Sequence, residues 1–172
     1  MVLAQHRLHP PILEIRSIVW PDEASCAAFA QGLAAAPALF PSTFIALDGP
    51  LGAGKTTFVR HLLRALGVAG RIKSPTFAVL EPYELADGRR ISHFDFYRFT
   101  DPREWEDAGF REIFAAPGLK LAEWPDKAAP VLPVPDWRLQ VDTDAHEARQ
   151  VQVHAMTPHG VDLLAMTTPA AR

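Results

Sequence analysis

The chain has 172 residues, 48% apolar and 22% charged, which is typical of one soluble globular domain with a sizeable core. Its formal net charge of −3 leaves no basic excess, so we expect no independent binding of nucleic acid. A single cysteine, Cys26, excludes an internal disulfide and fits a reducing compartment; we expect a buried structural thiol in a cytoplasmic protein.

Residues 1–12 lack the apolar core of a signal peptide, and we expect them to form a flexible N-terminal extension. The main domain is expected to span residues 13–155. It begins with Leu13–Val19, whose imperfect alternation of apolar and polar residues predicts a strand.

An alanine-rich helix is predicted next, because Pro21–Glu23 combines a proline with acids at a first turn. We expect it to run to about Ala36. Residues 24–47 carry no charge, but Pro37 and Pro41 interrupt them, and much of the run is alanine. This pattern argues against a membrane-spanning helix, and we expect no membrane partner.

The most informative stretch is Gly49–Thr56, G-P-L-G-A-G-K-T, which matches the phosphate-binding pattern G-x-x-x-x-G-K-[S/T] at every fixed position. A strand-like run, Thr43–Asp48, precedes it, and a helical pattern ending before Gly67 follows. The glycines let consecutive N–H groups face phosphate oxygens, and the helix dipole adds positive potential there. The sequence therefore predicts binding of a nucleoside triphosphate.

Two residues of this loop have predicted roles of their own. Lys55 brings a positive charge to the β- and γ-phosphates, and the Thr56 hydroxyl can ligate Mg²⁺. The predicted nucleotide-binding residues of the loop are Gly49, Leu51, Gly52, Ala53, Gly54, Lys55, Thr56 and Thr57.

A hairpin is predicted after the helix that follows the loop. Phe77–Glu84 has strand character, and Pro82 suggests an edge position. Asp87-Gly88 is a turn signal, and Ile91–Phe96 predicts the second strand.

The segment Asp101–Phe114 predicts one or two short helices, with Asp101 as the cap and Pro102 as the first residue. Leu119–Ala122 predicts another apolar strand. The proline-rich stretch Pro125–Pro135 predicts a loop.

The last predicted elements are two alternating segments, Trp137–Val141 and Arg149–Val153, joined by a polar turn as a hairpin. The tail, residues 156–172, has room for one short helix. Helices alternate with strands early in the chain, while later strands are closely spaced. The fold class predicted is α/β: a three-layer sandwich like that of phosphate-loop NTPases, with a central mixed, mostly parallel sheet.

Hydrolysis would need a further acid, and two acids lie where apolar strands end, Asp95 and Glu123. Either could hold the metal, and the other could polarise the nucleophile. Thr76, in a proline-stiffened loop, is a candidate switch residue whose hydroxyl could reach Mg²⁺ or the γ-phosphate. The predicted catalytic residues are thus Lys55, Asp95, Glu123 and Thr76.

Three further side chains near these acids, His93, Tyr97 and Trp124, are interpreted most simply as packed core residues.

Four segments together resemble one family. G-P-L-G-A-G-K-T-T-F, K-S-P-T-F, H-F-D-F-Y-R and A-E-W-P occur in that order, and the match spans about Pro21 to Val153. This combination is similar to the TsaE family, the small bacterial ATPases of tRNA threonylcarbamoyladenosine (t⁶A) biosynthesis. The phosphate loop alone is shared by very many ATPases and GTPases, so the other three segments give the resemblance its specificity.

The resemblance implies binding and hydrolysis of ATP with Mg²⁺, and association with a TsaB–TsaD pair that transfers threonylcarbamoyl to adenosine 37 of tRNA. Contact with tRNA would be indirect, through that complex. Thr56 and Glu123 would be metal-side residues, Asp95 the Walker-B-like acid and Thr76 part of the switch, while Trp124 would support Glu123.

Two weaker correspondences follow from the same resemblance. Glu23, in P-D-E, and Arg149, in A-R, match family segments near the nucleotide and are candidate nucleotide contacts. Pro50 departs from the acidic residue common in the family, but the backbone cradle does not depend on that side chain.

The residues leave a second function open. A small-molecule kinase shares the phosphate loop and the size, and Arg98, Arg103 and Arg111 could supply the arginines of a lid. A GTPase is disfavoured, because the chain contains no asparagine and so lacks the guanine-reading N-K-x-D motif. With 16 prolines and several long loops, we expect weak ATPase activity without the partners.

Overall fold

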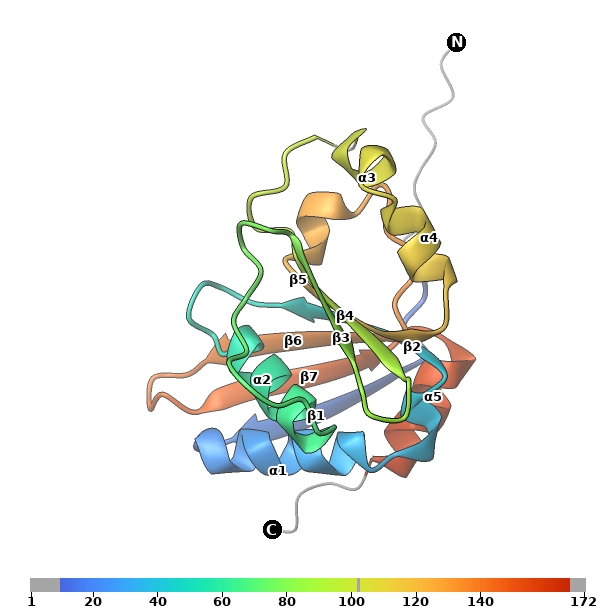
Figure 1. The fold of residues 1–172 in the computed structure, drawn as a ribbon. Helices are drawn as coiled ribbons and strands as arrows, with labels where there is room; N and C mark the ends of the chain where they lie inside the picture. Colours follow the sequence, from blue (N-terminus) through green and yellow to red (C-terminus); the bar gives the residue numbers. More distant parts are fainter. Residues whose placement is uncertain (1–9, 102, 168–172) are drawn as a thin grey trace.

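The computed structural model describes residues 10–101 and 103–167, which form an α/β fold around one seven-stranded sheet (Figure 1). The strands are β1 Glu14–Trp20, β2 Ser42–Asp48, β3 Leu80–Glu84, β4 Arg90–Asp95, β5 Gly118–Glu123, β6 Trp137–Thr143 and β7 Arg149–Ala155. The helices are α1 Glu23–Ala34, α2 Lys55–Ala65, α3 Arg103–Asp107, α4 Phe110–Ala115 and α5 Pro158–Met166, with 3₁₀ turns η1 Pro37–Leu39 and η2 Pro125–Ala128.

The sheet has the order β1-β7-β6-β2-β5-β4-β3. The four central strands β6, β2, β5 and β4 are parallel to one another. Antiparallel pairs join β7 to β6, β1 to β7 and β3 to β4. Within the described residues only β7 and β3 are therefore antiparallel to the remaining strands, and the predicted mixed, mostly parallel sheet is confirmed.

Helices cover both faces of the sheet and make three layers. Because strand side chains alternate between faces, Ile45 and Leu47 of β2 pack toward α1, α2 and α5, whereas Phe44 and Ala46 pack toward α3, α4 and η2. Figure 1 shows α1 and α2 side by side on one side of the sheet and α3 and α4 on the other.

The first half of the chain follows the predicted order closely. α1 ends at Ala34, two residues before the expected end, and Asp22 caps its start by accepting a hydrogen bond from the Ser25 N–H. Among the described residues, no helix combines the length and the apolar character that crossing a membrane would require. Cys26 is buried, as predicted.

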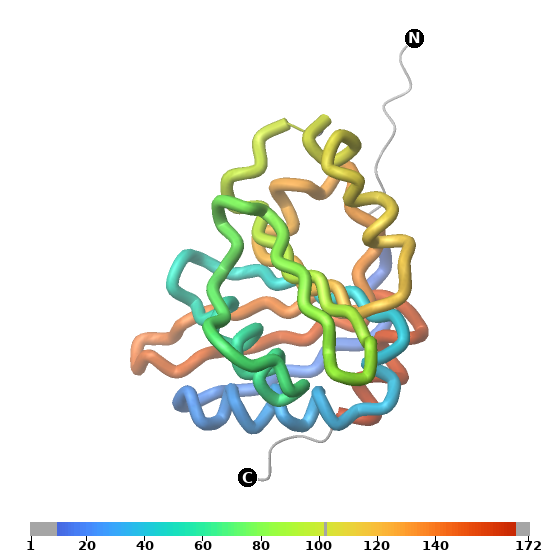
Figure 2. The backbone as a smooth tube through the Cα atoms, viewed as in Figure 1, coloured from blue at the N-terminus to red at the C-terminus, as the bar shows by residue number. Residues whose placement is uncertain are grey.

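One predicted strand begins late. Phe77–Glu84 was expected to be extended, but β3 begins only at Leu80, and the Phe77 side chain is 85% exposed. The preceding residues form a turn that ends in Val79, whose φ of 67° lies in the left-handed region. The tube in Figure 2 shows this long connection, in green, running from α2 to the edge strand β3. The edge position inferred from Pro82 is confirmed.

The later elements also match their predicted types. The segment after Asp101 forms two short helices, separated by Gly109 in the left-handed region; the predicted first helical residue, Pro102, lies outside the described residues. The Pro125–Pro135 stretch, expected to be a loop throughout, begins with the 3₁₀ turn η2. β6 and β7 form the predicted hairpin.

The end of the described chain packs onto the core. In the predicted tail, α5 is capped by Thr157 and buries Leu163 and Leu164. Of the predicted N-terminal extension, residues 1–9 lie outside the described part of the chain, as do residues 168–172 of the predicted tail.

Candidate functional site

The phosphate-binding loop joins the end of β2 to the start of α2. Gly49 has a φ of 142°, and a Cβ on it would lie 2.2 Å from the Val141 carbonyl oxygen, so only glycine fits. Gly54, with a φ of 108°, is the N-cap of α2, and within the described residues no side chain caps this helix start. The first N–H groups of α2 are therefore left for an anion.

Lys55 lies inside this loop and is 4% exposed. Its Nζ donates hydrogen bonds to the carbonyl oxygens of Gly49 (2.6 Å) and Pro50 (2.9 Å), and it lies 4.1 Å from the centroid of the Trp124 ring. Burial lowers the pKa of Lys55, whereas the nearby carboxylates, Glu123 first among them, act to raise it.

Glu123, at the carboxyl end of β5, is also buried and faces α2. The Thr56 hydroxyl is 2.8 Å from Glu123 Oε2 and 3.0 Å from Oε1, and it donates to this carboxylate. Nε2 of His93, on β4, is 2.8 Å from Glu123 Oε1. The structure thus brings together the two residues predicted to lie beside the metal, and it adds a histidine to them.

Asp95 ends the neighbouring strand β4 and pairs with Glu123 in the parallel register. Its Oδ2 accepts hydrogen bonds from the hydroxyls of Ser74 and Thr76, the latter at 3.1 Å, and its Oδ1 accepts one from the Tyr97 N–H at 2.9 Å. Asp95 therefore ties the predicted switch segment to the sheet.

These groups line one cleft of about 280 Å³ at the carboxyl ends of the central strands, where open α/β sheets bind ligands. The predicted Lys55, Thr56, Thr76, Asp95 and Glu123 all contribute to its lining. Its other lining residues are Leu51, Gly52, Gly54, Thr57, Ser74, Tyr97 and Trp124.

Glu23 and Arg149 lie in an adjoining pocket of about 150 Å³ rather than in this cleft. Arg149 Nε donates to the Ala53 carbonyl oxygen at 2.8 Å, and Glu23 Oε1 accepts a hydrogen bond from His61 Nε2 at 2.9 Å. Gly54 and Thr57 border both spaces. The remaining lining of the pocket is Trp20, Asp22, Cys26 and Glu147.

Two aromatic residues predicted to be in the core lie at the edge of the cleft, and of the two only Trp124 packs against a core cluster. Tyr97 is 41% exposed, and Trp124 is half-buried with a φ of 56°. Their ring centroids lie 5.0 Å apart beside the cleft. Both follow the strand-end acids in the sequence, and this position was the signal that they border the site.

Sequence reasoning also left out two polar partners of the acids, Ser74 and His93. Ser74 lies in the same S-P-T-F segment as Thr76, and this shared segment is the signal that its hydroxyl also reaches Asp95. His93 is fully buried, as a core histidine would be, and only its contact with Glu123 distinguishes it.

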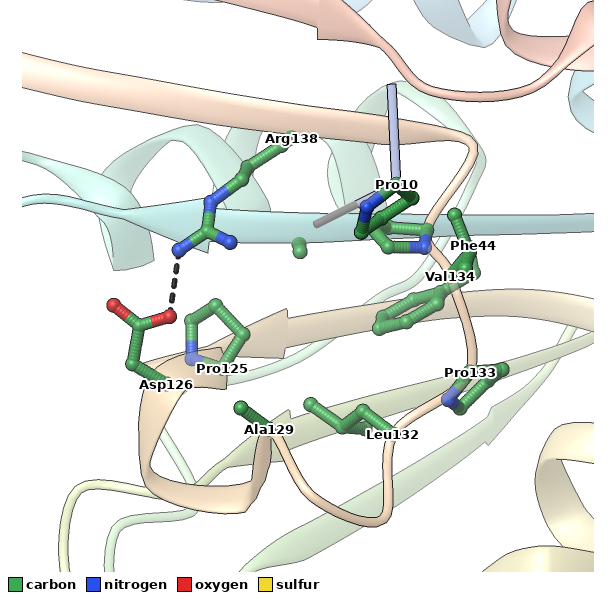
Figure 3. Close-up of a pocket in the computed structure, with 11 residues that line it drawn as sticks. Pro10, Phe44, Pro125, Asp126, Ala129, Leu132, Pro133, Val134 and Arg138 are labelled. Atoms are coloured by element: carbon green, nitrogen blue, oxygen red, sulfur yellow. Dashed lines mark hydrogen bonds and ion pairs between the residues drawn. The ribbon is translucent and has the colours of Figure 1, made fainter. Parts of the chain in front are cut away.

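A separate cavity, of about 340 Å³, lies between the sheet and the segment that follows η2 (Figure 3). Leu132, Pro133 and Val134 lie along it, and the ion pair of Arg138 with Asp126 lies at one end. Its lining is mostly proline and aliphatic, so it does not offer the donors that a triphosphate needs.

The residues of the first cleft fit Mg²⁺ and a nucleoside triphosphate. A hydroxyl and a carboxylate, Thr56 and Glu123, are the hard oxygen ligands that Mg²⁺ prefers. The uncapped start of α2 and the buried Lys55 supply donors for phosphate oxygens.

Comparisons with known proteins identify the family of this chain. The family model for threonylcarbamoyl adenosine biosynthesis protein TsaE matches residues 20–151. The tRNA threonylcarbamoyladenosine biosynthesis protein TsaE of Haemophilus influenzae is 40% identical over 118 residues, which cover 69% of this chain and 73% of that protein. Its namesake from Bacillus subtilis is 33% identical over 117 residues, covering 67% and 72%.

A solved structure supports the fold. The crystal structure of Bacillus subtilis YdiB superposes with a TM-score of 0.70 and 24% identity, covering 88% of this chain and 94% of that one. The family match spans the phosphate loop, both strand-end acids and Arg149. On these grounds, the chain belongs to the TsaE family.

Proposed function

We propose that this protein binds ATP with Mg²⁺ in the cleft at the phosphate loop and hydrolyses it, as a subunit that supports t⁶A formation in tRNA by a TsaB–TsaD-like pair. The observation that carries the proposal is the convergence of Lys55, Thr56, Asp95 and Glu123 in one cleft. Membership of the TsaE family, whose model names threonylcarbamoyl adenosine biosynthesis, supports the pathway.

Each residue has a distinct task in this proposal. The backbone N–H groups from Gly52 to Thr56 hold the phosphate oxygens, and Lys55 exchanges its present carbonyl partners for the β- and γ-phosphates. Thr56 and Glu123 would hold Mg²⁺, which would supply positive charge to neutralise the phosphates.

Asp95 acts through the switch segment. Because Ser74 and Thr76 donate to its carboxylate, a change in the position of Thr76 changes the hydrogen bonds of an acid that borders the cleft. A partner that fixes this segment would complete the site, so we expect weak hydrolysis by the isolated protein and faster hydrolysis with the partner pair.

The test is the hydrolysis of ATP by the purified protein, with and without Mg²⁺ and with and without a TsaB–TsaD pair. We expect stimulation by the pair and a loss of about 100-fold or more in Lys55→Ala and Glu123→Ala. Lys127→Ala and Glu84→Ala, which change exposed residues of the same types, are the matched controls. Unstimulated turnover that is insensitive to both site variants would contradict the proposal.

A second assay addresses the pathway itself. In a reconstituted reaction containing tRNA, threonylcarbamoyl donor and the TsaB–TsaD pair, adding this protein with ATP is expected to raise the yield of t⁶A. Following labelled γ-phosphate in the same mixture distinguishes the kinase alternative, because a kinase transfers the label to a metabolite and a hydrolase releases it as inorganic phosphate.

A further inference from the structure

The buried residue His93 has no role in the function proposed so far. It is 0% exposed, and its Nε2 lies 2.8 Å from Oε1 of Glu123. In the parallel register His93 is opposite Leu121 and Asp95 is opposite Glu123. Side chains two apart share a face, so His93 and Glu123 both project toward the helix that carries Thr56.

The two ring nitrogens of His93 have very different surroundings. A carboxylate only accepts hydrogen bonds, so Nε2 carries the proton in the contact with Glu123. Nδ1 is buried and finds no hydrogen-bond partner among residues 10–101 and 103–167. The contact with Glu123 therefore fixes the tautomer and the orientation of the ring.

A histidine kept only for packing would be poorly suited to this place. One buried nitrogen without a partner costs folding free energy, and an aliphatic side chain of similar size would avoid that cost. The arrangement is better suited to holding a carboxylate, because an imidazole N–H directs one oxygen and leaves the other free.

The second donor to Glu123, the Thr56 hydroxyl, is shared with the proposed metal site. If the oxygen of Thr56 held Mg²⁺, the metal as well as the carboxylate would set the position of this hydroxyl. The His93 N–H approaches from β4, a different element, and does not depend on the metal.

We infer that His93 is a positioning residue, which holds the carboxylate of Glu123 in the orientation that Mg²⁺ and the reacting phosphate require. The inference rests on the proposed function, because that proposal gives Glu123 its role as a metal ligand. Partners that orient metal ligands in this way typically contribute about 10- to 100-fold to metal affinity or activity.

The test compares His93→Leu, which removes the donor at similar volume, with His93→Gln, whose amide nitrogen can replace Nε2–H. We expect His93→Leu to lower kcat by about 10- to 100-fold and to reduce the gain in ADP affinity on adding Mg²⁺ by a similar factor. ADP affinity in the absence of Mg²⁺ should be unchanged. His93→Gln should recover most of both losses. His159→Leu, which removes a histidine bonded to Thr43 away from the cleft, is the control.

Two readouts do not depend on turnover. Long-range ¹H–¹⁵N spectra should show the Nε2–H tautomer for the resonance that disappears in His93→Gln, and Glu123→Gln should shift that resonance. A crystal structure of His93→Leu should show the Glu123 carboxylate turned from its position in the wild-type protein.

The outcomes separate the two proposals. If the wild-type protein does not hydrolyse ATP, the proposed function fails, while the tautomer and the Glu123 orientation still decide the role of His93. The inference is overturned if Glu123 keeps its orientation in His93→Leu. It is also overturned if His93→Leu and His93→Gln reduce the effect of Mg²⁺ on ADP binding equally. An Nδ1–H tautomer would overturn it as well.

Discussion

Cys26 provides a test of the local environment beside the phosphate loop. Its thiol is 4% exposed, and burial, with a smaller effect from the charge of Glu23, raises its pKa to about 12. Because the thiolate is the reactive form, we predict that a disulfide reagent at pH 8 labels the native protein about 100-fold or more slowly than the unfolded chain. Labelling kinetics with and without guanidinium measure this ratio, and equal rates would contradict it.

Asp48, the last residue of β2, is an acid whose charge the fold tolerates poorly. Its side chain is 17% exposed, and burial raises its pKa from 3.8, although Arg138 Nε approaches Oδ2 to 2.5 Å. Oδ2 still lacks a partner with hydrogen-bond geometry among the described residues, so the ion pair does not fully replace hydration.

We therefore predict that Asp48→Asn stabilises the protein relative to wild type at neutral pH, by about 1 kcal/mol. Below pH 3.8 Asp48 is protonated in both the folded and the unfolded state, so the advantage vanishes. Between pH 3.8 and the raised folded pKa the unfolded chain ionises more readily than the folded protein, so the advantage grows; above the folded pKa it is fully present. Urea unfolding of both proteins between pH 4 and 8 measures it.

Asp87→Asn is the control, with the opposite sign. Hydrogen bonds from Arg89 lower the pKa of Asp87, so its carboxylate contributes stability above pH 3.8 that is lost as the pH falls through the folded pKa. If the two variants changed with pH in the same direction, the assignment for Asp48 would be wrong.

At the scale of single elements, α5 approaches the sheet through a glycine. A Cβ on Gly160 would lie 2.1 Å from the Asp136 carbonyl oxygen, which already accepts a hydrogen bond from the Met156 N–H at 2.9 Å. The Gly160 carbonyl oxygen in turn accepts a 2.8 Å hydrogen bond from the indole of Trp137. The helix cannot move away from the sheet without losing that bond.

We predict that Gly160→Ala lowers the free energy of unfolding by about 1–3 kcal/mol, the usual cost of overpacking. Asp162→Ala, on the exposed side of the same helix, should change it by less than about 0.5 kcal/mol. Denaturant unfolding of both variants is the measurement. Equal effects of the two substitutions would show that the approach of α5 to the sheet is not limited by the missing Cβ.

The segment before β3 shows where sequence prediction of an element fails. Phe77 and Val79 have high strand propensity, yet they lie in a turn, and the Asp95 N–H donates to the Val79 carbonyl oxygen at 2.9 Å. Hydrogen bonds from Ser74 and Thr76 to Asp95 hold the same segment. These contacts join residues about twenty positions apart, so tertiary structure overrides a local preference that alone favours a strand.

At the scale of the whole molecule, the sequence predicted the fold class and the acids, and the family resemblance placed Thr56 and Glu123 beside one metal. The direct contacts of each acid were not predicted. Asp95 and Glu123 could be placed together because parallel strands end at one edge of a sheet. That Glu123 contacts Thr56 while Asp95 contacts the switch hydroxyls depends on side-chain orientation across three elements. Periodicity carries no information about such contacts. The same reason explains why His93 could only be interpreted as a core residue.

Binding at the cleft should also stabilise the molecule as a whole, because the loop, both acids and the switch segment come from different elements of one domain. At a concentration of 100 times its Kd, a ligand that binds only the folded state raises the free energy of unfolding by about 2.7 kcal/mol. For a domain of this size this corresponds to an increase of roughly 5–10 °C in Tm. We predict such a shift with Mg²⁺ and a non-hydrolysable ATP analogue in scanning calorimetry.

Lys55→Ala should abolish this shift in Tm, and Glu123→Ala should remove the part that requires Mg²⁺, whereas Lys127→Ala should retain all of it. A shift of the same size in Lys55→Ala would mean that the analogue binds elsewhere, and the proposed nucleotide site would then be wrong.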